Sequence, residues 1–150
     1  GGSIVRGCTA NSNGIAGISG GPSSLIEGNT ARDNKFDGIA ARTDSTVVGN
    51  VARHNGGDGI DVMSGSVVSG NSAYDNTSDG IEASADTVVS GNTTRTNTGF
   101  GLNGVASTAY IDNVFSDNNL VAADDRQVNS GLQIGSNVCR AVQHTGNSCP

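Results

Sequence analysis

The sequence repeats itself every 21 residues. A glycine returns with this period five times, and an aspartate takes the sixth place: Gly7, Gly28, Gly49, Gly70, Gly91 and Asp112. A second column is asparagine throughout: Asn13, Asn34, Asn55, Asn76, Asn97 and Asn118. Because no insertion disturbs the period from residue 1 to about residue 120, we expect copies of one structural unit stacked on one another. The predicted repeats are residues 1–21, 22–42, 43–63, 64–84, 85–105 and 106–120.

Each repeat holds three short apolar stretches separated by glycine, asparagine or aspartate. Apolar and polar residues alternate within a stretch, which is the pattern of a strand with one buried face. Three such strands cannot each find a hairpin partner within a repeat, but each can pair with its own copy in the next repeat. The predicted fold is therefore all-β, a parallel solenoid with 21-residue coils and three short strands per coil. Aromatic residues make up 3% of the chain and 23 of its 150 residues are glycine, so we expect a narrow core lined by small side chains.

Asparagine occupies two positions near the corners of each predicted coil. The interior members of these columns are Asn34, Asn50, Asn55, Asn71, Asn76, Asn92 and Asn97. Asparagine tolerates the positive φ that a tight corner needs. Identical amides stacked about 4.8 Å apart can also hydrogen-bond to one another along the rod. We therefore predict a structural role for these residues, and a cost of about 1–3 kcal/mol for a substitution such as Asn71→Ala.

A recurrent pattern, S/T-x-V-x-G-N followed by Asn five residues later and then by D-G-I, covers residues 1 to about 120. It resembles the right-handed parallel β-helix proteins, among them the pectate-lyase-like and NosD-like carbohydrate-binding repeats. The resemblance implies a right-handed parallel β-helix of six to seven coils and a secreted or cell-surface module. Its expected role is binding, with polysaccharide as the ligand, or structural. The alternative is a Ca²⁺-dependent polysaccharide lyase or epimerase that acts on uronate polymers.

The 21-residue period breaks after Asn119. We interpret LVAADDRQVNS as an inserted loop before GLQIG, with Gly131 and Leu132 as the seventh Gly-Ile pair and Ile134 as its second inward residue. Residues 121–150 are then expected to hold this loop, a last partial coil and a C-terminal cap.

Three cysteines are present: Cys8, Cys139 and Cys149. The last two close a short loop, and a disulfide between them would add about 3 kcal/mol in the loop-entropy description. Three free thiols are the alternative, and the state of Cys8 is left open. A disulfide indicates an oxidising compartment, so we expect the chain in the extracellular space, on the cell surface or in the periplasm.

Acidic side chains stack on successive repeats next to the Gly-Ile pair. Asp37, Asp58 and Asp79 precede the glycine, and Asp61, Glu82 and Asn103 are expected to point outward from the following strand. Like charges one coil apart repel by roughly 1 kcal/mol per pair in a water-like dielectric. A cation, most simply Ca²⁺ on oxygen ligands, would offset this repulsion. The resemblance implies that this strand is the substrate face, with Asp58, Asp61, Asp79 and Glu82 as candidate metal ligands. The alternative is that aspartate suits an Asp-Gly corner on a solvated surface.

Arg42, Asp61 and Glu82 are the candidate catalytic residues. The resemblance to pectate lyases implies a basic side chain as the proton acceptor, and Arg42 is the basic residue nearest the acids in the sequence pattern. An arginine of ordinary pKa is a poor base, which argues against β-elimination. Carboxyl pairs one coil apart would suit a retaining glycosidase, but aromatic platforms for sugar rings are lacking. The sequence thus leaves catalysis open and favours a module without it.

The charge pattern limits the partners that we expect. The net charge of −6 disfavours nucleic acid, which needs a basic surface. The sequence contains no run of 18 apolar residues, the length that a membrane span needs. One basic column, beside His54, lies on a different strand from the acids and contains Arg32, Arg53, Tyr74 and Arg95.

A column of apolar residues is expected to face outward. Its strongest members are Ile4, Leu25, Val67 and Val88. An exposed stripe of this kind predicts an interface, so we expect either self-association through it or cover by the C-terminal tail. The N-terminal coil end is a second candidate for pairing with another chain.

Overall fold

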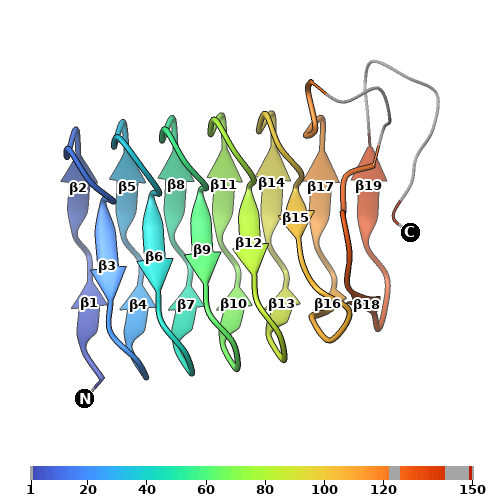
Figure 1. The fold of residues 1–150 in the computed structure, drawn as a ribbon, viewed down its shortest axis with the longest axis horizontal. Helices are drawn as coiled ribbons and strands as arrows, with labels where there is room; N and C mark the ends of the chain where they lie inside the picture. The colour runs from blue at the N-terminus through green and yellow to red at the C-terminus, as the bar shows by residue number, and fades with distance from the viewer. Residues whose placement is uncertain (1, 122–125, 141–148, 150) are drawn as a thin grey trace.

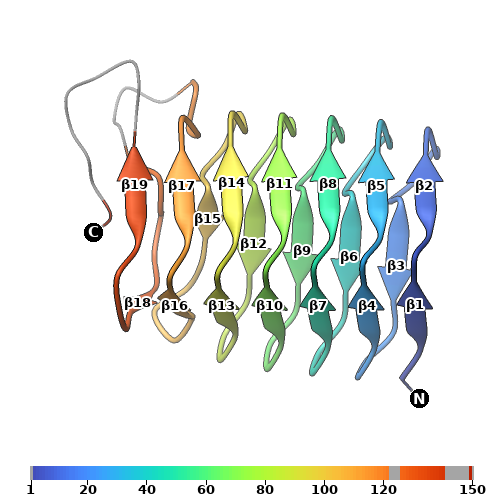
Figure 2. The ribbon, with the colours of Figure 1, turned by 180° about the vertical axis from the view of Figure 1, so that it is seen from behind.

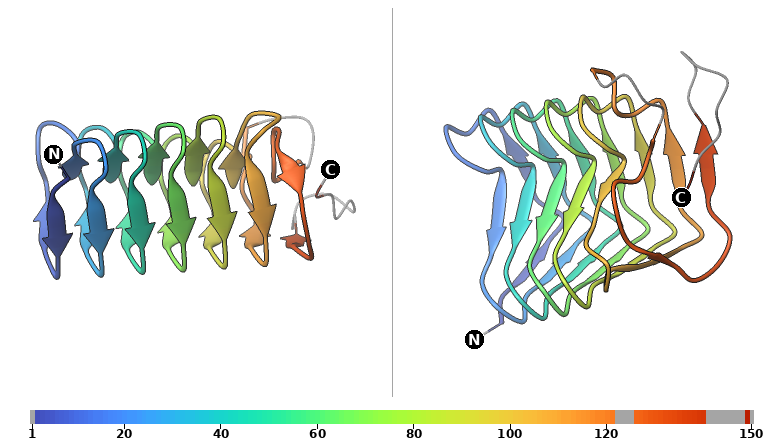
Figure 3. Two further views of the ribbon diagram at one scale, coloured as in Figure 1. Left: turned by 90° about the horizontal axis from the view of Figure 1, so that it is seen from below. Right: turned by 45° about the vertical axis from the view of Figure 1, so that its right-hand side comes forward.

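The chain folds into a rod of stacked coils in which every strand pairs with its own copy one coil along. The structure is a computed structural model that describes residues 2–121, 126–140 and Cys149. Coils follow one another from the N-terminus to the C-terminal end along the rod (Figure 1, Figure 3). Within these residues no helix is long and apolar enough to cross a membrane.

Three parallel sheets form the faces of the rod. Sheet A contains β1 (Ile4–Arg6), β4 (Leu25–Glu27), β7 (Thr46–Val48), β10 (Val67–Ser69), β13 (Val88–Ser90), β16 (Ala109–Ile111) and β18 (Leu132–Gln133). Sheet B contains β2 (Thr9–Asn11), β5 (Thr30–Arg32), β8 (Val51–Arg53), β11 (Ser72–Tyr74), β14 (Thr93–Arg95), β17 (Val114–Ser116) and β19 (Val138–Arg140). Sheet C contains β3 (Ile18–Gly20), β6 (Ile39–Ala41), β9 (Ile60–Val62), β12 (Ile81–Ala83) and β15 (Leu102–Asn103). Sheet C faces the viewer in Figure 1, and sheets A and B do so in Figure 2. The predicted solenoid with three strands per coil is confirmed.

The core is narrow because each three-residue strand points only one or two side chains inward. In sheets A and B this is the middle residue, and in sheet C it is the first and the last. Sheet A contributes Ile26, Val47, Val68, Val89 and Tyr110, all buried. Sheet B contributes mostly alanine, which leaves room for the isoleucines of sheet C. In the sixth coil the alanine column becomes Phe115, whose ring packs edge-on against Tyr110 with the centroids 6.3 Å apart. The rod is therefore filled by aliphatic side chains and alanine over most of its length, and by two aromatic rings near its C-terminal end.

The two asparagine columns form continuous hydrogen-bonded ladders, as predicted. The Asn50 backbone N–H and its amide Nδ2 donate to Asn71 Oδ1, at 2.8 and 3.0 Å. Asn71 Nδ2 in turn donates to the Val47 carbonyl oxygen at 2.9 Å and to Asn92 Oδ1 at 3.0 Å. Each interior amide thus satisfies buried backbone groups at a corner, where the sheets cannot do so.

The expected reason for asparagine at these corners needs one correction. The asparagines do not adopt positive φ; the residue before each one does. In the first ladder that residue is Gly28, Gly49, Gly70, Gly91 or Asp112, and in the second it is Asp33, His54, Asp75, Thr96 or Asp117. The preceding residue makes the turn, and asparagine is required for its amide.

The glycine before each inward isoleucine is explained by space. A Cβ on Gly59 would lie 2.6 Å from the Gly80 carbonyl oxygen and 2.8 Å from Ala73 Cβ. Both distances are shorter than atoms can tolerate, so a side chain would push neighbouring coils apart. The glycine of each Gly-Ile pair therefore lets the corner before sheet C pack directly against sheet B and against the next coil.

The assignment of the seventh coil from sequence was wrong. Val128, not Leu132, takes the seventh inward position: it is fully buried and bridges to Leu102. Leu132 instead pairs with Ala109 in sheet A and is 56% exposed, and Ile134 is also exposed. The inserted segment is shorter than expected, so the chain returns to the Gly-Ile position four residues earlier than Leu132 would place it.

Both asparagine ladders end on side chains of this last coil. Gln127 Oε1 accepts from the Asn118 backbone N–H at 2.8 Å, and Asn137 Oδ1 accepts from the Asn113 backbone N–H at 2.9 Å. The predicted disulfide joins Cys139 and Cys149 with their Cα atoms 5.5 Å apart, whereas Cys8 is a free, exposed thiol. The remainder of the predicted C-terminal cap lies outside the described residues.

Candidate functional site

An acidic ladder runs along the corner that leads into sheet C. The backbone N–H of Asp58 donates to Asp37 Oδ1 at 2.9 Å, and that of Asp79 donates to Asp58 Oδ1 at 2.7 Å. The column ends at Phe100, whose N–H donates to Asp79 Oδ1 at 2.6 Å. One oxygen of each carboxylate therefore has a structural function, which supports the reading of aspartate as a corner residue.

Small residues on the next coil make room for these carboxylates. A Cβ on Gly57 would lie 2.2 Å from Asp37 Oδ1, and a Cβ on Gly99 would lie 2.2 Å from Asp79 Oδ1. Asp58 and Asp79 are accordingly almost buried, each 8% exposed. Two carboxylates held this way have lost most of their water, so their oxygens need polar partners within the protein or a bound ion.

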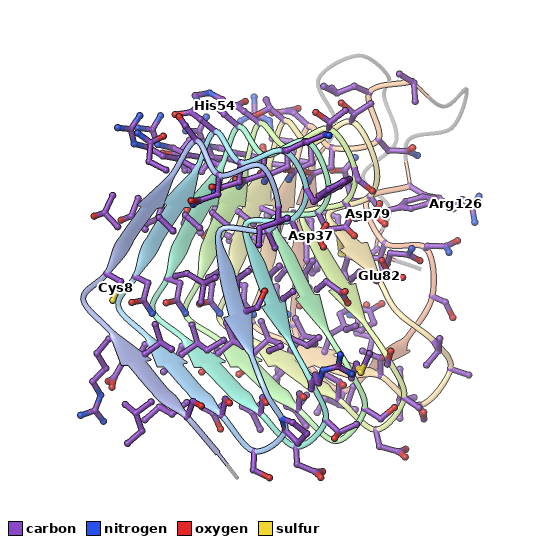
Figure 4. All side chains as sticks on the ribbon, turned by 60° about the vertical axis from the view of Figure 1, so that its left-hand side comes forward. Cys8, Asp37, His54, Asp79, Glu82 and Arg126 are labelled. Carbon is purple, nitrogen blue, oxygen red and sulfur yellow. A yellow bond between two sulfur atoms is a disulfide. The ribbon has the colours of Figure 1, made fainter. Side chains whose placement is uncertain are left out.

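The carboxylates of Asp58 and Asp79 come close to that of Glu82. Asp58, Asp79 and Glu82 each place one carboxylate oxygen within 4.8 Å of the others, and Figure 4 shows Asp79 and Glu82 on the same face of the rod, with Asp37 close by. Glu82 lies at the middle of β12, in register with Asp61 on β9. We refer to Asp58, Asp79 and Glu82 as the acidic cluster, with Asp61 at its edge.

Two amides border this cluster. Asn103 Nδ2 donates to Asp79 Oδ2 at 2.9 Å, and Asn103 Oδ1 accepts from Asn129 Nδ2 at 2.9 Å. The sequence pattern pointed to Asn103, which continues the column of Glu82. It missed Asn129, because Asn129 follows the break in the period and belongs to no column.

Burial and crowding raise the pKa of three of these acids. Desolvation, a side-chain hydrogen bond to Asp58 and the negative charges of its neighbours raise the pKa of Glu82 to about 7. Desolvation and the charges of Asp37 and Asp58 raise the pKa of Asp61 to about 6. Burial also raises the pKa of Asp79. Near neutral pH a proton and a metal cation therefore compete for the carboxylates of the cluster.

A pH dependence of stability follows from these shifts. The folded state holds protons on Glu82 and Asp61 more tightly than the unfolded state, so ionisation destabilises the fold as the pH rises from about 4.5 towards 7. In EDTA we expect the melting temperature to increase by a few degrees when the pH falls from 8 to 5.5. Thermal melts of Glu82→Gln provide the comparison, because this variant should lose most of the slope; an equal slope would contradict the assignment.

The donor set of the cluster fits a hard cation. Carboxylate and amide oxygens are the ligands that Ca²⁺ takes, six to eight at a time. Asp58, Asp79 and Glu82 could bind such an ion, with Asp61 or Asn103 beside them. The arrangement can thus hold one divalent cation at the surface of sheet C and leave coordination positions open to a ligand.

Arg42 stands apart from this group. It is exposed, follows β6, and forms no ion pair with an acid among the residues that the structure describes. The structure brings Asp58, Asp79 and Glu82 together and keeps Asp61 next to them, whereas Arg42 forms no ion pair with any of these acids.

Comparison with known proteins identifies the architecture. The family model described as "Right handed beta helix region" matches residues 1–148. Among solved structures, the A-module of the Azotobacter vinelandii mannuronan C-5 epimerase AlgE4 superposes with a TM-score of 0.79 at 21% identity. The periplasmic alginate epimerase AlgG gives a TM-score of 0.69 at 18% identity. No curated protein sequence matches the chain significantly.

These similarities cover most of this chain and less than half of the others. The alignment spans 95% of this chain and 47% of the AlgE4 module, and 89% of this chain and 39% of AlgG. At these identities the likeness establishes the fold, and the right-handed parallel β-helix expected from the sequence is confirmed.

Proposed function

Because the chain belongs to the right-handed β-helix family, we propose that it is a module that binds acidic polysaccharide, with Ca²⁺ at the acidic cluster of sheet C. The observation that carries this proposal is the convergence of three carboxylate oxygens within 4.8 Å of one another. Two of these carboxylates are almost buried, so their mutual repulsion is poorly screened by water. A bound cation would remove that repulsion.

Uronate polymers are the ligand class that suits such a site. A cation held by Asp58, Asp79 and Glu82 would offer its remaining coordination positions to the carboxylate and hydroxyl oxygens of a sugar. The solved structures most relevant to this choice are named as epimerases of mannuronan and of alginate, which are polymers of uronic acid. The exposed surface of sheet C runs along the rod and could accommodate an extended chain.

A binding panel tests this proposal. The chain is titrated with polymannuronate, polyguluronate, polygalacturonate and a neutral dextran, in Ca²⁺ and in EDTA. We expect at least one uronate polymer to bind more tightly in Ca²⁺, and dextran to bind in neither condition. Equal affinity for every uronate polymer with and without Ca²⁺ would refute a calcium site that recognises the ligand.

The pKa of Glu82, about 7, favours catalysis as a second candidate function. A carboxyl group with this pKa can exchange a proton near neutral pH, as a uronate lyase or epimerase requires. Glu82 and Asp61 are the candidate acid and base, and Arg42 is the basic residue that could assist them. Incubation with each uronate polymer distinguishes the two functions: a lyase yields unsaturated chain ends, an epimerase changes the NMR signals at C-5, and a binding module does neither.

The proposal also includes the location of the module. The disulfide between Cys139 and Cys149 is consistent with an oxidising compartment, so we place the module outside the cytosol.

Self-association through the apolar stripe also stays a prediction. Ile4, Val67 and Val88 are exposed on sheet A, and Leu25 lies partly buried beside them. We expect light scattering to show a species larger than the monomer, and Val67→Lys with Val88→Lys to return it to monomer. A monomeric wild-type chain would exclude this interface.

A further inference from the structure

The most ordered set of charged side chains outside the acidic cluster lies on the outer surface of sheet B. Strand register aligns one outward position of every coil along the rod: Asn11, Arg32, Arg53, Tyr74, Arg95, Ser116 and Arg140. Four of the eight lysines and arginines of the chain stand in this single column. In a chain with a net charge of −6, basic residues are thus concentrated on one face. We call this set the arginine column.

The spacing within the arginine column is regular. Arg53, Arg95 and Arg140 occupy every second coil, with Tyr74 and Ser116 between them. Because neighbouring strands lie about 4.8 Å apart, successive guanidinium groups of this series are about 10 Å apart along the rod. A linear polymer that lies parallel to the rod axis and carries an acidic group at this interval would meet all three.

Acidic residues at the neighbouring corner bond to residues other than these three arginines. Each of them has a partner of its own: Asp33 accepts from Arg32 Nη1 at 2.8 Å, Asp75 accepts from the Thr96 hydroxyl, and Asp117 accepts from the Ser116 hydroxyl at 2.8 Å. His54 also lies between two of these acids, with Nε2 3.4 Å from Asp75 Oδ2. Figure 4 shows His54 at the corner of the rod, well separated from Asp79 and Glu82.

Arg53, Arg95 and Arg140 form no ion pair within the part of the chain that the structure describes. Two of them are nevertheless held in place. The guanidinium of Arg95 stacks over the Tyr74 ring, 4.4 Å from its centroid, and Arg53 Nη1 lies 3.3 Å from His54 Nδ1. Less conformational entropy is lost when such pre-ordered groups bind a ligand.

We propose that the arginine column of sheet B is a second binding surface for a uronate polymer, one that needs no metal ion. The choice of a polysaccharide as ligand rests on the proposed function, whereas the column itself does not. Guanidinium groups pair with carboxylates through two parallel hydrogen bonds, which suits a sugar acid. In an extended 1,4-linked chain, every second residue turns its carboxylate to the same side, an interval similar to two coils.

Nucleic acid fits this surface less well. A protein that binds it needs a basic field over a wide area, and the remainder of this chain is acidic. The arginine column is only one residue wide and is bordered by Asp33 and Asp75. A narrow row of separate cations favours a single chain with widely spaced charges over a densely charged phosphate backbone.

The experiment measures affinity for uronate oligomers in EDTA, where the acidic cluster cannot contribute through a metal. Arg53→Gln combined with Arg95→Gln is expected to weaken binding about tenfold or more, because two charge-assisted contacts are lost. The matched control is Arg6→Gln with Lys35→Gln, which removes the same two charges at exposed positions outside the arginine column and should bind like the wild type.

Three results would overturn the proposal: no uronate binding by the wild type in EDTA, equal weakening by the control pair, or single-stranded DNA that displaces uronate at lower concentration than uronate displaces DNA. Failure of the proposed calcium site would look different. In that case Ca²⁺ would leave uronate affinity unchanged, while the Arg53 and Arg95 substitutions would still reduce it.

Discussion

Replacing Asp79 by Asn and Glu82 by Gln together is expected to weaken Ca²⁺ binding by at least about 100-fold, because calcium affinity depends strongly on the number of charged ligands. Two of the three converging carboxylates are lost in this variant. The fold should persist, since the amide oxygen of an asparagine in place of Asp79 could still accept from the Phe100 N–H. In the absence of metal the variant should even be somewhat more stable at pH 8, because it lacks the carboxyl group whose pKa desolvation and neighbouring charges raise to about 7.

A matched control separates ligand loss from a general change of charge. Glu27→Gln with Asp86→Asn removes the same two charges at positions on other parts of the rod. Asparagine also tolerates the positive φ of Asp86. Calorimetric titration should give wild-type affinity for this control. If both double variants bind Ca²⁺ equally, or the Asp79 and Glu82 variant binds like the wild type, the acidic cluster is not the metal site.

Asn71→Ala is expected to lower the free energy of unfolding by about 3–6 kcal/mol, more than the sequence alone indicated, because the buried Asn50 N–H loses its acceptor, at about 1–3 kcal/mol, and three further hydrogen bonds are lost at about 1 kcal/mol each. Four hydrogen bonds meet at this amide, and their partners at Asn50, Val47 and Asn92 are buried. In a chain of this size the melting temperature should fall by roughly 10 °C or more.

Thermal melts followed by circular dichroism measure this loss. Asn11→Ala is the control, because Asn11 is exposed on the first strand of sheet B and belongs to neither ladder. It should melt within a few degrees of the wild type. Equal melting of Asn71→Ala and the wild type would show that the amide ladder does not contribute to stability.

The period of 21 residues made the solenoid predictable, because each column has its own physical reason to recur. Val68 and Ile81 recur because they fill the core, and Asn71 recurs because its amide satisfies two neighbouring coils. A regular stack also fixes which residues are neighbours across the sheets, so the register of Glu82 with Asp61 followed from counting.

The sequence did not predict which residue turns each corner, or which residue points inward after the period breaks. Gly70 and Asn71 are adjacent and both tolerate positive φ, so the sequence could not say which of them turns the corner. Val128 was missed as an inward residue because the inserted segment shifts the numbering, and nothing in the composition of that segment fixes its length. Inward positions can be assigned by counting residues only where the 21-residue period holds.

The sequence predicted which acidic residues stack on one another, but not how their carboxylate oxygens are arranged. Asp58 and Asp79 were expected to stack, yet the sequence could not show that one oxygen of each is engaged by a backbone N–H and that both carboxylates lie close to Glu82. Nor could it show that Arg42 forms no ion pair with these acids. Such questions depend on rotamers, which the repeat pattern does not determine.

The central claim is that one calcium ion and a uronate chain bind to the same site. Calorimetric titration of the wild-type chain with Ca²⁺, alone and with a saturating uronate oligomer, tests it most directly, because a sugar carboxylate that coordinates the ion favours its binding, and this coupling is reciprocal. We predict one Ca²⁺ per chain and a higher affinity for Ca²⁺ when the oligomer is present. No Ca²⁺ binding, or an affinity that the oligomer leaves unchanged, would contradict this account.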